Sequence, residues 1–199
     1  MNKIFVLLLV VILLFSFAGC EGEKQADPTQ PSIPQKTPDQ GPEDVTDNPA
    51  LAVLQNIWEQ FQGTKDDYVG GSGAEYQTGA PWQVALSDTD FLQGALFLSE
   101  KQLQKVTAAA SLMHGLNTNN LTVGAIALGS DTDYEAFAAE IKDRILQNQW
   151  VCGRPGGMRI VRVGECLLIL YGSGSYSGSF VDALNEAYPE AEVLCRETI

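Results

Sequence analysis

The sequence has one histidine, His114, and its cysteines lack the Cys-x-x-Cys spacing typical of zinc or redox sites. Basic residues are scarce too: 12 Lys and Arg stand against 25 Asp and Glu, and the formal charge is −13. Nucleic-acid binding depends on clustered basic residues that release counterions, and attraction to anionic lipid needs a polybasic run. We therefore expect no nucleic-acid partner, no metal site and no cofactor.

The sequence also has no apolar run of the roughly 20 residues that a membrane-spanning helix needs. The longest run, Ile4 to Phe15, follows Lys3 and precedes Ser16-Phe17-Ala18-Gly19-Cys20. A basic head, a short apolar segment and a small-residue cleavage site make a secretory signal. Phe17 to Cys20 also resembles the bacterial lipobox, although Leu is usual where Phe17 stands.

We therefore predict a signal peptide at residues 1–19 and a Cys20 that carries a diacylglycerol and palmitate. The protein would then be anchored to the cell membrane, facing outside the cytoplasm. An ordinary secretory signal with an unmodified Cys20 is the alternative. Residues 20–48 hold five prolines among polar residues, which predicts a disordered tether. Residues 49–199 are expected to form one globular domain.

The N-terminal part of the domain predicts two helices. Apolar residues recur at helical spacing after Pro49 as far as Gly63. A second helix is expected over Ser99 to His114, with Leu103, Val106, Ala110 and Met113 on one face. Between them, the glycine-rich stretch 64–81 suggests a surface loop, and residues 82–86 suggest a short strand.

Beyond residue 120 the pattern alternates between strands and helices. Strands are predicted at 121–128, 158–163, 166–171 and 191–195, with helices at 131–149 and 180–188. Gly164-Glu165 would join two of the strands in a type II′ hairpin. This order predicts an α+β fold with a ferredoxin-like β-α-β-β-α-β antiparallel sheet and two additional N-terminal helices.

That topology places the strands from 121 and 166 at the centre of the sheet. The apolar strand at 166–171 needs cover on both faces. The two helices of the motif would cover one face, and the helices at 51–62 and 99–114 the other. The alternative is an exposed sheet face used for binding.

A glycine-rich loop with Gly172, Gly174 and Gly178 links a strand to a helix, as in dinucleotide-binding loops. We treat these glycines as a possible ligand-contacting loop. Two features argue against nucleotide binding: the preceding strand comes from a hairpin, and little of the chain remains after the loop. The alternative is a flexible connection in which Ser177 or Ser179 caps the helix.

The pentapeptides Ser87 to Phe91 and Ser130 to Tyr134 are nearly identical, and their paired aspartates suit Ca²⁺ or Mg²⁺. Helix capping is the better interpretation, with Ser130 and Asp133 or Thr132 and Glu135 forming a capping box.

Three cysteines lie in the domain: Cys152, Cys166 and Cys195. A cysteine with His114 would suit acyl transfer, but no local motif supports a catalytic set. A Cys152–Cys195 disulfide is easier than a pairing with Cys166. Arg154, Arg159 and Arg162 form the basic cluster; they would receive a carboxylate or phosphate, or protect an edge strand by charge, which we prefer.

Four segments carry a family resemblance: SLM at 111–113, VGAIAL at 123–128, the helix at 134–149 and VGECLLIL at 163–170. With the lipobox and the tether, they resemble an uncharacterised family of Gram-positive lipoproteins, a domain of unknown function. The glycine-rich stretch at 63–81 and the three domain cysteines depart from that pattern. The resemblance implies a lipoprotein of unknown role and brings no catalytic residues.

The sequence thus predicts a membrane-anchored, cell-surface lipoprotein whose domain is a non-catalytic binding or interaction module. Its partner would be an envelope protein or a small ligand. The alternative is a thiol-dependent envelope enzyme that uses a cysteine with His114.

Overall fold

A computed structural model describes residues 47–151 and 153–199, and it shows an α+β fold built on one antiparallel sheet. The signal peptide, Cys20 and the tether before residue 47 lie outside the described residues, as does Cys152. The eight strands of the sheet are β1 (Tyr68–Ser72), β2 (Glu75–Thr78), β3 (Trp82–Gln83), β4 (Val106–His114), β5 (Leu121–Leu128), β6 (Gly157–Val163), β7 (Cys166–Gly172) and β8 (Glu192–Glu197).

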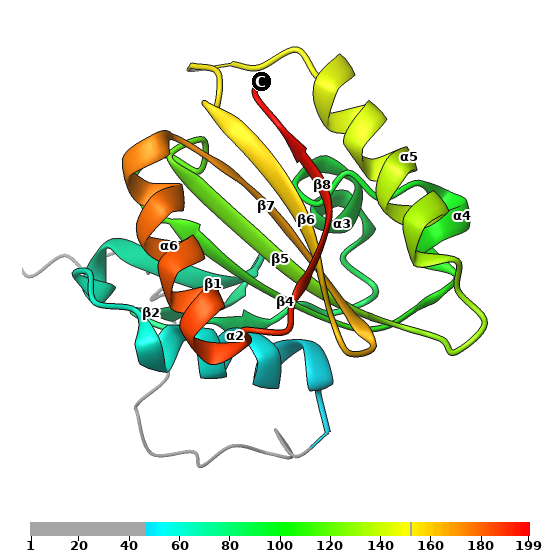
Figure 1. The fold of residues 1–199 in the computed structure, drawn as a ribbon, viewed down its shortest axis with the longest axis horizontal. Helices are drawn as coiled ribbons and strands as arrows, with labels where there is room; N and C mark the ends of the chain where they lie inside the picture. Colours follow the sequence, from blue (N-terminus) through cyan, green and yellow to red (C-terminus); the bar gives the residue numbers. More distant parts are fainter. Residues whose placement is uncertain (1–46, 152) are drawn as a thin grey trace, which may run out of the picture. The chain divides into compact units, whose positions relative to one another are not determined.

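The helices are α2 (Pro49–Gln60), α3 (Thr89–Gly94), α4 (Glu100–Leu103), α5 (Tyr134–Gln147) and α6 (Gly174–Ala187), with a 3-10 turn, η2, at Lys65–Asp67. Figure 1 shows the sheet between two helical layers, with α6 on one side and α5 on the other. In the described part of the chain, no helix has the length and apolar character needed to span a membrane.

The helix predicted after Pro49 is confirmed. Pro49 occupies its first turn, and the Asn48 side chain caps it by accepting a hydrogen bond from the Leu51 N–H at 2.9 Å. Its buried side chains, Leu51, Leu54, Ile57 and Trp58 among them, pack on the sheet. The helical spacing of these residues therefore predicted the face that is buried.

The prediction of a surface loop at 64–81 is wrong, because this stretch forms the β1–β2 hairpin. A Cβ at Gly70 would lie 2.2 Å from the Trp82 nitrogen, and Gly71 has a φ of +93°. The glycines therefore permit close backbone packing inside a sheet. The short strand expected from residue 82 is present as β3, which pairs with β4.

The helix predicted over residues 99–114 is also wrong. Ser99 does cap a helix, but that helix, α4, ends at Leu103, and the rest forms strand β4. Ala109 packs into one core layer, whereas Ala110 and Leu112 pack into the other. A strand covered on both faces is an almost continuous apolar run, which spacing alone does not distinguish from a buried helix.

The strand order departs from the ferredoxin-like prediction. The sheet runs β2-β1-β4-β5-β7-β6-β8, so the last strand pairs with β6, not with β5. Strand β4 takes the place beside β5. The central positions of β5 and β7 are confirmed, and every residue of both strands is buried.

This order explains why α5 and α6 lie on opposite faces, where the prediction had put them on one. Helix α5 links the parallel strands β5 and β6 across β7, and α6 links β7 and β8 across β6. Both connections run towards the β8 edge of the sheet, but they start from β5 and β7, which are antiparallel. Right-handed connections then require helices on opposite faces.

The core therefore has two layers, one on each face of the sheet. One layer lies under α2 and α6 and includes Ile57, Phe180 and Leu168. The other lies under α3, α4 and α5 and includes Leu96, Ile141 and Ile169. The hairpin at Gly164-Glu165 is confirmed: Gly164 has a φ of +57°, and Glu165 is not among the residues with positive φ, as a type II′ turn requires.

Candidate functional site

The three glycines of the predicted ligand-contacting loop are not brought together in a loop. Gly172 ends β7, Gly174 begins α6, and Gly178 lies inside that helix. A Cβ at Gly172 would lie 2.4 Å from the Asn120 oxygen, and the Ser173 N–H donates to the same oxygen at 2.9 Å. Packing of two chain segments thus accounts for Gly172.

The other two glycines have no close neighbour, since a Cβ at Gly174 or Gly178 would meet nothing within 4 Å. The predicted caps are wrong as well: Ser177 and Ser179 lie inside α6, where their hydroxyls donate to Ser173 O and Ser175 O. Nothing in this geometry favours a nucleotide.

His114 lies at one end of the sheet, buried between two tyrosines. Its ring centroid is 5.7 Å from that of Tyr68 and 4.8 Å from that of Tyr176, both edge-on. Its Nδ1 accepts a hydrogen bond from the Asn117 N–H at 3.3 Å. Aromatic packing and one backbone contact therefore account for this histidine.

Cys166 lies at the other end of the sheet from His114. The register pairs Met113 with Thr122 and Thr122 with Tyr171, five residues along β7 from Cys166, which is about 16 Å at strand spacing. Burial, and then the charge of Glu165, raise the pKa of the Cys166 thiol to about 11. The structure thus separates His114 from Cys166 and keeps this thiol protonated at neutral pH.

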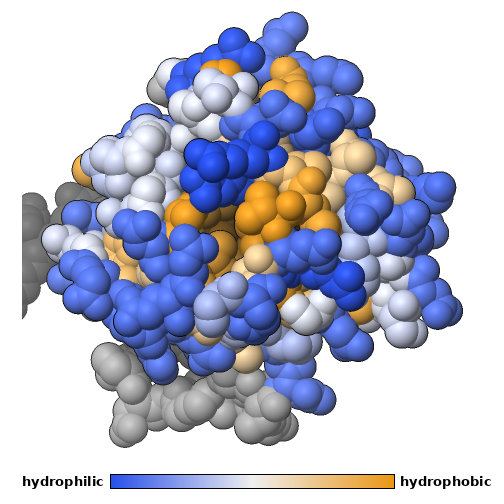
Figure 2. Space-filling model, viewed as in Figure 1, coloured by the Kyte–Doolittle hydropathy of each residue, from blue (hydrophilic) through white to orange (hydrophobic). Residues whose placement is uncertain are grey.

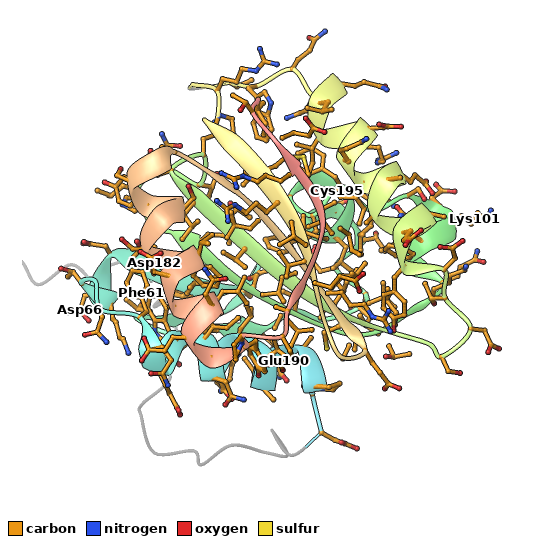
Figure 3. All side chains as sticks on the ribbon, viewed as in Figure 1. Phe61, Asp66, Lys101, Asp182, Glu190 and Cys195 are labelled. Atoms are coloured by element: carbon orange, nitrogen blue, oxygen red, sulfur yellow. The ribbon has the colours of Figure 1, made fainter. Side chains whose placement is uncertain are left out.

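Cys195, labelled in Figure 3, lies on the edge strand β8, where burial raises the pKa of its thiol. Cys166 and Cys195 are both free cysteines. The predicted Cys152–Cys195 disulfide involves Cys152, which lies outside the described residues.

The two aspartate pentapeptides cap helices, as the preferred interpretation held. Asp88 accepts a hydrogen bond from the Phe91 N–H at 3.1 Å, and Asp133 accepts one from the Ala136 N–H at 3.0 Å. The caps are thus the aspartates themselves, and the predicted Ser130 and Thr132 boxes do not form. No metal-ligating cluster of His, Cys, Asp and Glu occurs among residues 47–151 and 153–199.

An open pocket of about 340 Å³ lies between the start of α5, β6 and β8. The lining is mostly polar and comprises Ser130, Thr132, Asp133, Tyr134, Glu135, Arg162, Glu192 and Leu194. We call it the Arg162 pocket. These residues come from three separate segments of the chain, which the β8–β6 pairing brings together.

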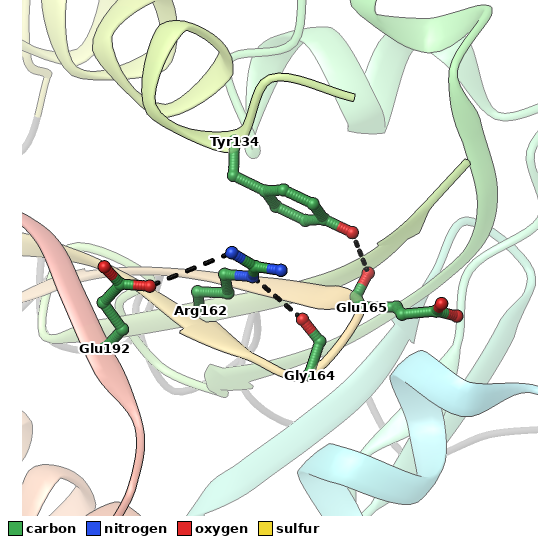
Figure 4. Close-up of polar contacts among 5 residues, drawn as sticks. All are labelled: Tyr134, Arg162, Gly164, Glu165 and Glu192. Carbon is green, nitrogen blue, oxygen red and sulfur yellow. Dashed lines mark hydrogen bonds and ion pairs between the residues drawn. The ribbon is translucent and has the colours of Figure 1, made fainter. Parts of the chain in front are cut away.

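Arg162 is held in place by three contacts (Figure 4). Its guanidinium carbon lies 4.1 Å from the centroid of the Tyr134 ring, and its Nε donates to the Gly164 carbonyl at 3.0 Å. Its Nη1 lies 3.9 Å from a carboxylate oxygen of Glu192. The Arg162 side chain remains 42% exposed, so a fixed cation faces solvent at the pocket.

Tyr134 is held by its hydroxyl, which donates to the Glu165 carbonyl at 3.3 Å. Burial raises the pKa of Tyr134 above its usual value; the Arg162 cation opposes this rise, and Glu165 adds to it. The tyrosine therefore stays neutral at physiological pH. It serves the pocket as a ring on which Arg162 rests and supplies no ionised oxygen.

The pocket combines charges of both signs. Arg162 carries the positive charge, whereas Asp133, Glu135 and Glu192 carry negative charge. The Asp133 carboxylate is engaged as a helix cap, and Glu192 lies beside Arg162 itself, so Glu135 is the acid that is most open to a ligand. A fixed guanidinium beside carboxylates can hold a ligand that has both an anionic and a cationic group.

One residue of this pocket, Arg162, belongs to the basic cluster that the sequence analysis singled out. Arg162 was assigned to edge protection, but β6 lies inside the sheet and β8 is the edge. Only the pairing of Arg162 with Glu192 across β6 and β8 shows that the two belong to one site.

In comparisons with known proteins, no family model matched the chain, and neither a curated protein nor a solved structure matched it significantly.

Proposed function

We propose that this protein is a lipid-anchored, extracytoplasmic binding protein whose domain holds a ligand without catalysing a reaction. The anchoring part is supported by Lys3, the apolar run 4–15 and the lipobox-like Phe17 to Cys20. The proline-rich residues 20–48 would then hold the domain away from the lipid surface. The resemblance to Gram-positive lipoproteins agrees with this placement.

The observation that carries the binding part is the position of Arg162. Its planar cation is fixed on the Tyr134 ring and against the Gly164 carbonyl, so little side-chain entropy is lost when it pairs with a ligand. Restraining an exposed arginine contributes little to the stability of the fold, so the restraint of Arg162 favours a role in binding. The pocket thus has the preorganised polar group that small-molecule sites use for orientation.

The charge distribution of the pocket indicates the class of ligand. A simple anion would be repelled by Glu135 and Glu192, and a simple cation by Arg162. A zwitterion, such as an amino acid or a short peptide, satisfies both: its carboxylate pairs with Arg162, and its ammonium with the acids. We therefore propose a small zwitterionic ligand.

The test is calorimetric titration of the full chain in detergent with glycylglycine, acetate and ethylamine as probes. We expect heat of binding with glycylglycine, little with either single-charge probe, and loss of the signal in Arg162→Gln. Arg144→Gln is the matched control, because Arg144 is exposed in the last turn of α5 and does not line the pocket. Equal binding by the Arg162 and Arg144 variants would refute the proposal.

The second candidate is the thiol-dependent enzyme. Its support is weakened by the burial of Cys166 and by the distance between that thiol and His114. Cys152 is the cysteine on which this alternative now depends. Alkylation of the native protein decides it: a single fast-reacting thiol at Cys152 would favour the enzyme over the binding protein.

A further inference from the structure

Two arginines face each other across strands β6 and β8. Arg159 pairs directly with Arg196 in the register, so both side chains leave the sheet on the same face. That face carries α6, because Val161, two residues along β6, packs in the core layer beneath α6. The pair is therefore on the opposite side of the sheet from the Arg162 pocket. We call Arg159 and Arg196 the arginine pair.

The pair has no charge partner in the part of the chain that the structure describes. The ion pairs found there are Lys142–Asp143 and Arg162–Glu192, and no side-chain hydrogen bond involves Arg159 or Arg196. This is unexpected in a chain with 25 acidic residues. Like charges directly opposite each other destabilise a sheet, and Asp182 is the carboxylate that offsets part of this repulsion at Arg159.

The environment of Arg159 increases the cost of this repulsion. Its side chain is half-buried, and its pKa is lowered first by this burial and then by the charge of Arg196. The charge of Asp182 on α6, labelled in Figure 3, raises the pKa of Arg159. Asp182 nevertheless makes no ion pair with either arginine. One carboxylate at a distance thus leaves a local excess of positive charge.

Edge protection accounts for only one member of the pair, Arg196, which lies on the edge strand β8. The edge strand is β8, and it already carries Glu192 and Glu197, whereas Arg159 lies on β6 inside the sheet. Figure 2 shows the surface over β8, between α6 and α5, with an apolar patch among strongly hydrophilic side chains. Val193, between Glu192 and Arg196 in sequence, is 55% exposed. The surface beside the arginine pair is thus open to a ligand.

We propose that the arginine pair is a binding site for a phosphate group. Two adjacent guanidiniums present more donors and charge than one carboxylate can use, because a single arginine already binds a carboxylate through two hydrogen bonds. A tetrahedral phosphate group has enough oxygens to accept from both. The acidic charge elsewhere on the chain is screened beyond about 8 Å at physiological salt.

The test is the thermal unfolding of the full chain in detergent, with inorganic phosphate or acetate at matched ionic strength. We expect phosphate at ten times its Kd to raise Tm by roughly 3 to 5 °C, and acetate to leave it unchanged. Arg196→Gln should raise Tm in acetate, since repulsion is removed, and should abolish the phosphate shift. An arginine with a merely structural role would give a lower Tm in both buffers.

Two further variants sharpen the test. Asp182→Asn should increase the phosphate shift by removing the competing carboxylate, and Arg144→Gln should leave it unchanged. Sedimentation with phosphatidylglycerol and phosphatidylcholine vesicles, using the Cys20→Ala chain, separates the sources of phosphate. Binding to the anionic vesicles that is lost in Arg196→Gln assigns a lipid headgroup, and a shift with inorganic phosphate alone assigns a soluble phosphate. An equal Tm shift with acetate, or an undiminished phosphate shift in Arg196→Gln, would overturn the proposal.

Discussion

The guanidinium carbon of Arg162, on strand β6, lies 4.1 Å from the centre of the ring of Tyr134, in the first turn of α5. The two residues are 28 positions apart in the sequence, and Glu192 joins them from β8. A cation held on an aromatic face in this way is restrained before any ligand arrives.

Tyr134→Ala should weaken binding of the zwitterionic probe by roughly tenfold, because Arg162 loses the ring that restrains it. Tyr134→Phe is the matched control: it keeps the ring and removes only the hydrogen bond to the Glu165 carbonyl. Calorimetric titration of both variants gives the comparison. If Phe weakened binding as much as Ala, the hydroxyl and not the ring would be responsible.

Gly172→Ala should destabilise the domain by about 1–3 kcal/mol, because its Cβ would lie 2.4 Å from the Asn120 oxygen. Gly178→Ala tests the same change where a Cβ meets nothing within 4 Å in a helix, and it should stabilise by about 0.5–1 kcal/mol. Urea unfolding measures both. Two similar destabilisations would contradict the open space that the structure shows around Gly178.

Asp133→Ala should cost about 1 kcal/mol of stability, since the Asp133 carboxylate caps α5. Asp131→Ala is the control, because Asp131 is exposed and precedes the helix. The free energies of unfolding in urea distinguish them. An equal loss in both variants, reversed by Ca²⁺, would instead support a metal site at the pentapeptide.

Burial of the Cys166 thiol makes the stability of the fold depend on pH, and the sign of this dependence follows from the raised pKa. Its pKa is raised from 9.0 to about 11 in the folded protein, so folding favours the protonated thiol. This contribution to stability is fully present below about pH 9 and is lost as the pH rises towards 11. Cys166→Ala should reduce the loss of stability between pH 9 and pH 11. An unchanged pH profile would show that the thiol is not buried as described.

Sequence patterns predicted the elements whose signals are local. Helices α2 and α5 have apolar residues at helical spacing, and Gly164 marked the hairpin between β6 and β7. Strand β4 was missed because its alanines have high helix propensity, which the two core layers around the strand override.

The partner of β8 was not predictable in the same way. The sequence located this strand correctly, but its pairing with β6 in place of β5 depends on contacts far apart in the chain. The Arg162 pocket and the arginine pair both depend on that pairing. Neither site could therefore be predicted from the sequence, although Arg159 and Arg162 were identified as part of one basic cluster.

The lipid anchor is the central claim, because it decides which ligands the domain can meet. The most direct measurement is the intact mass of the native protein extracted from membranes, followed by sequencing of its N-terminal peptide. We predict a chain that begins at Cys20 and carries a diacylglycerol with fatty acyl groups, and a Cys20→Ala variant that lacks this mass. A chain that retains Met1, or that is cleaved with an unmodified Cys20, would contradict the account.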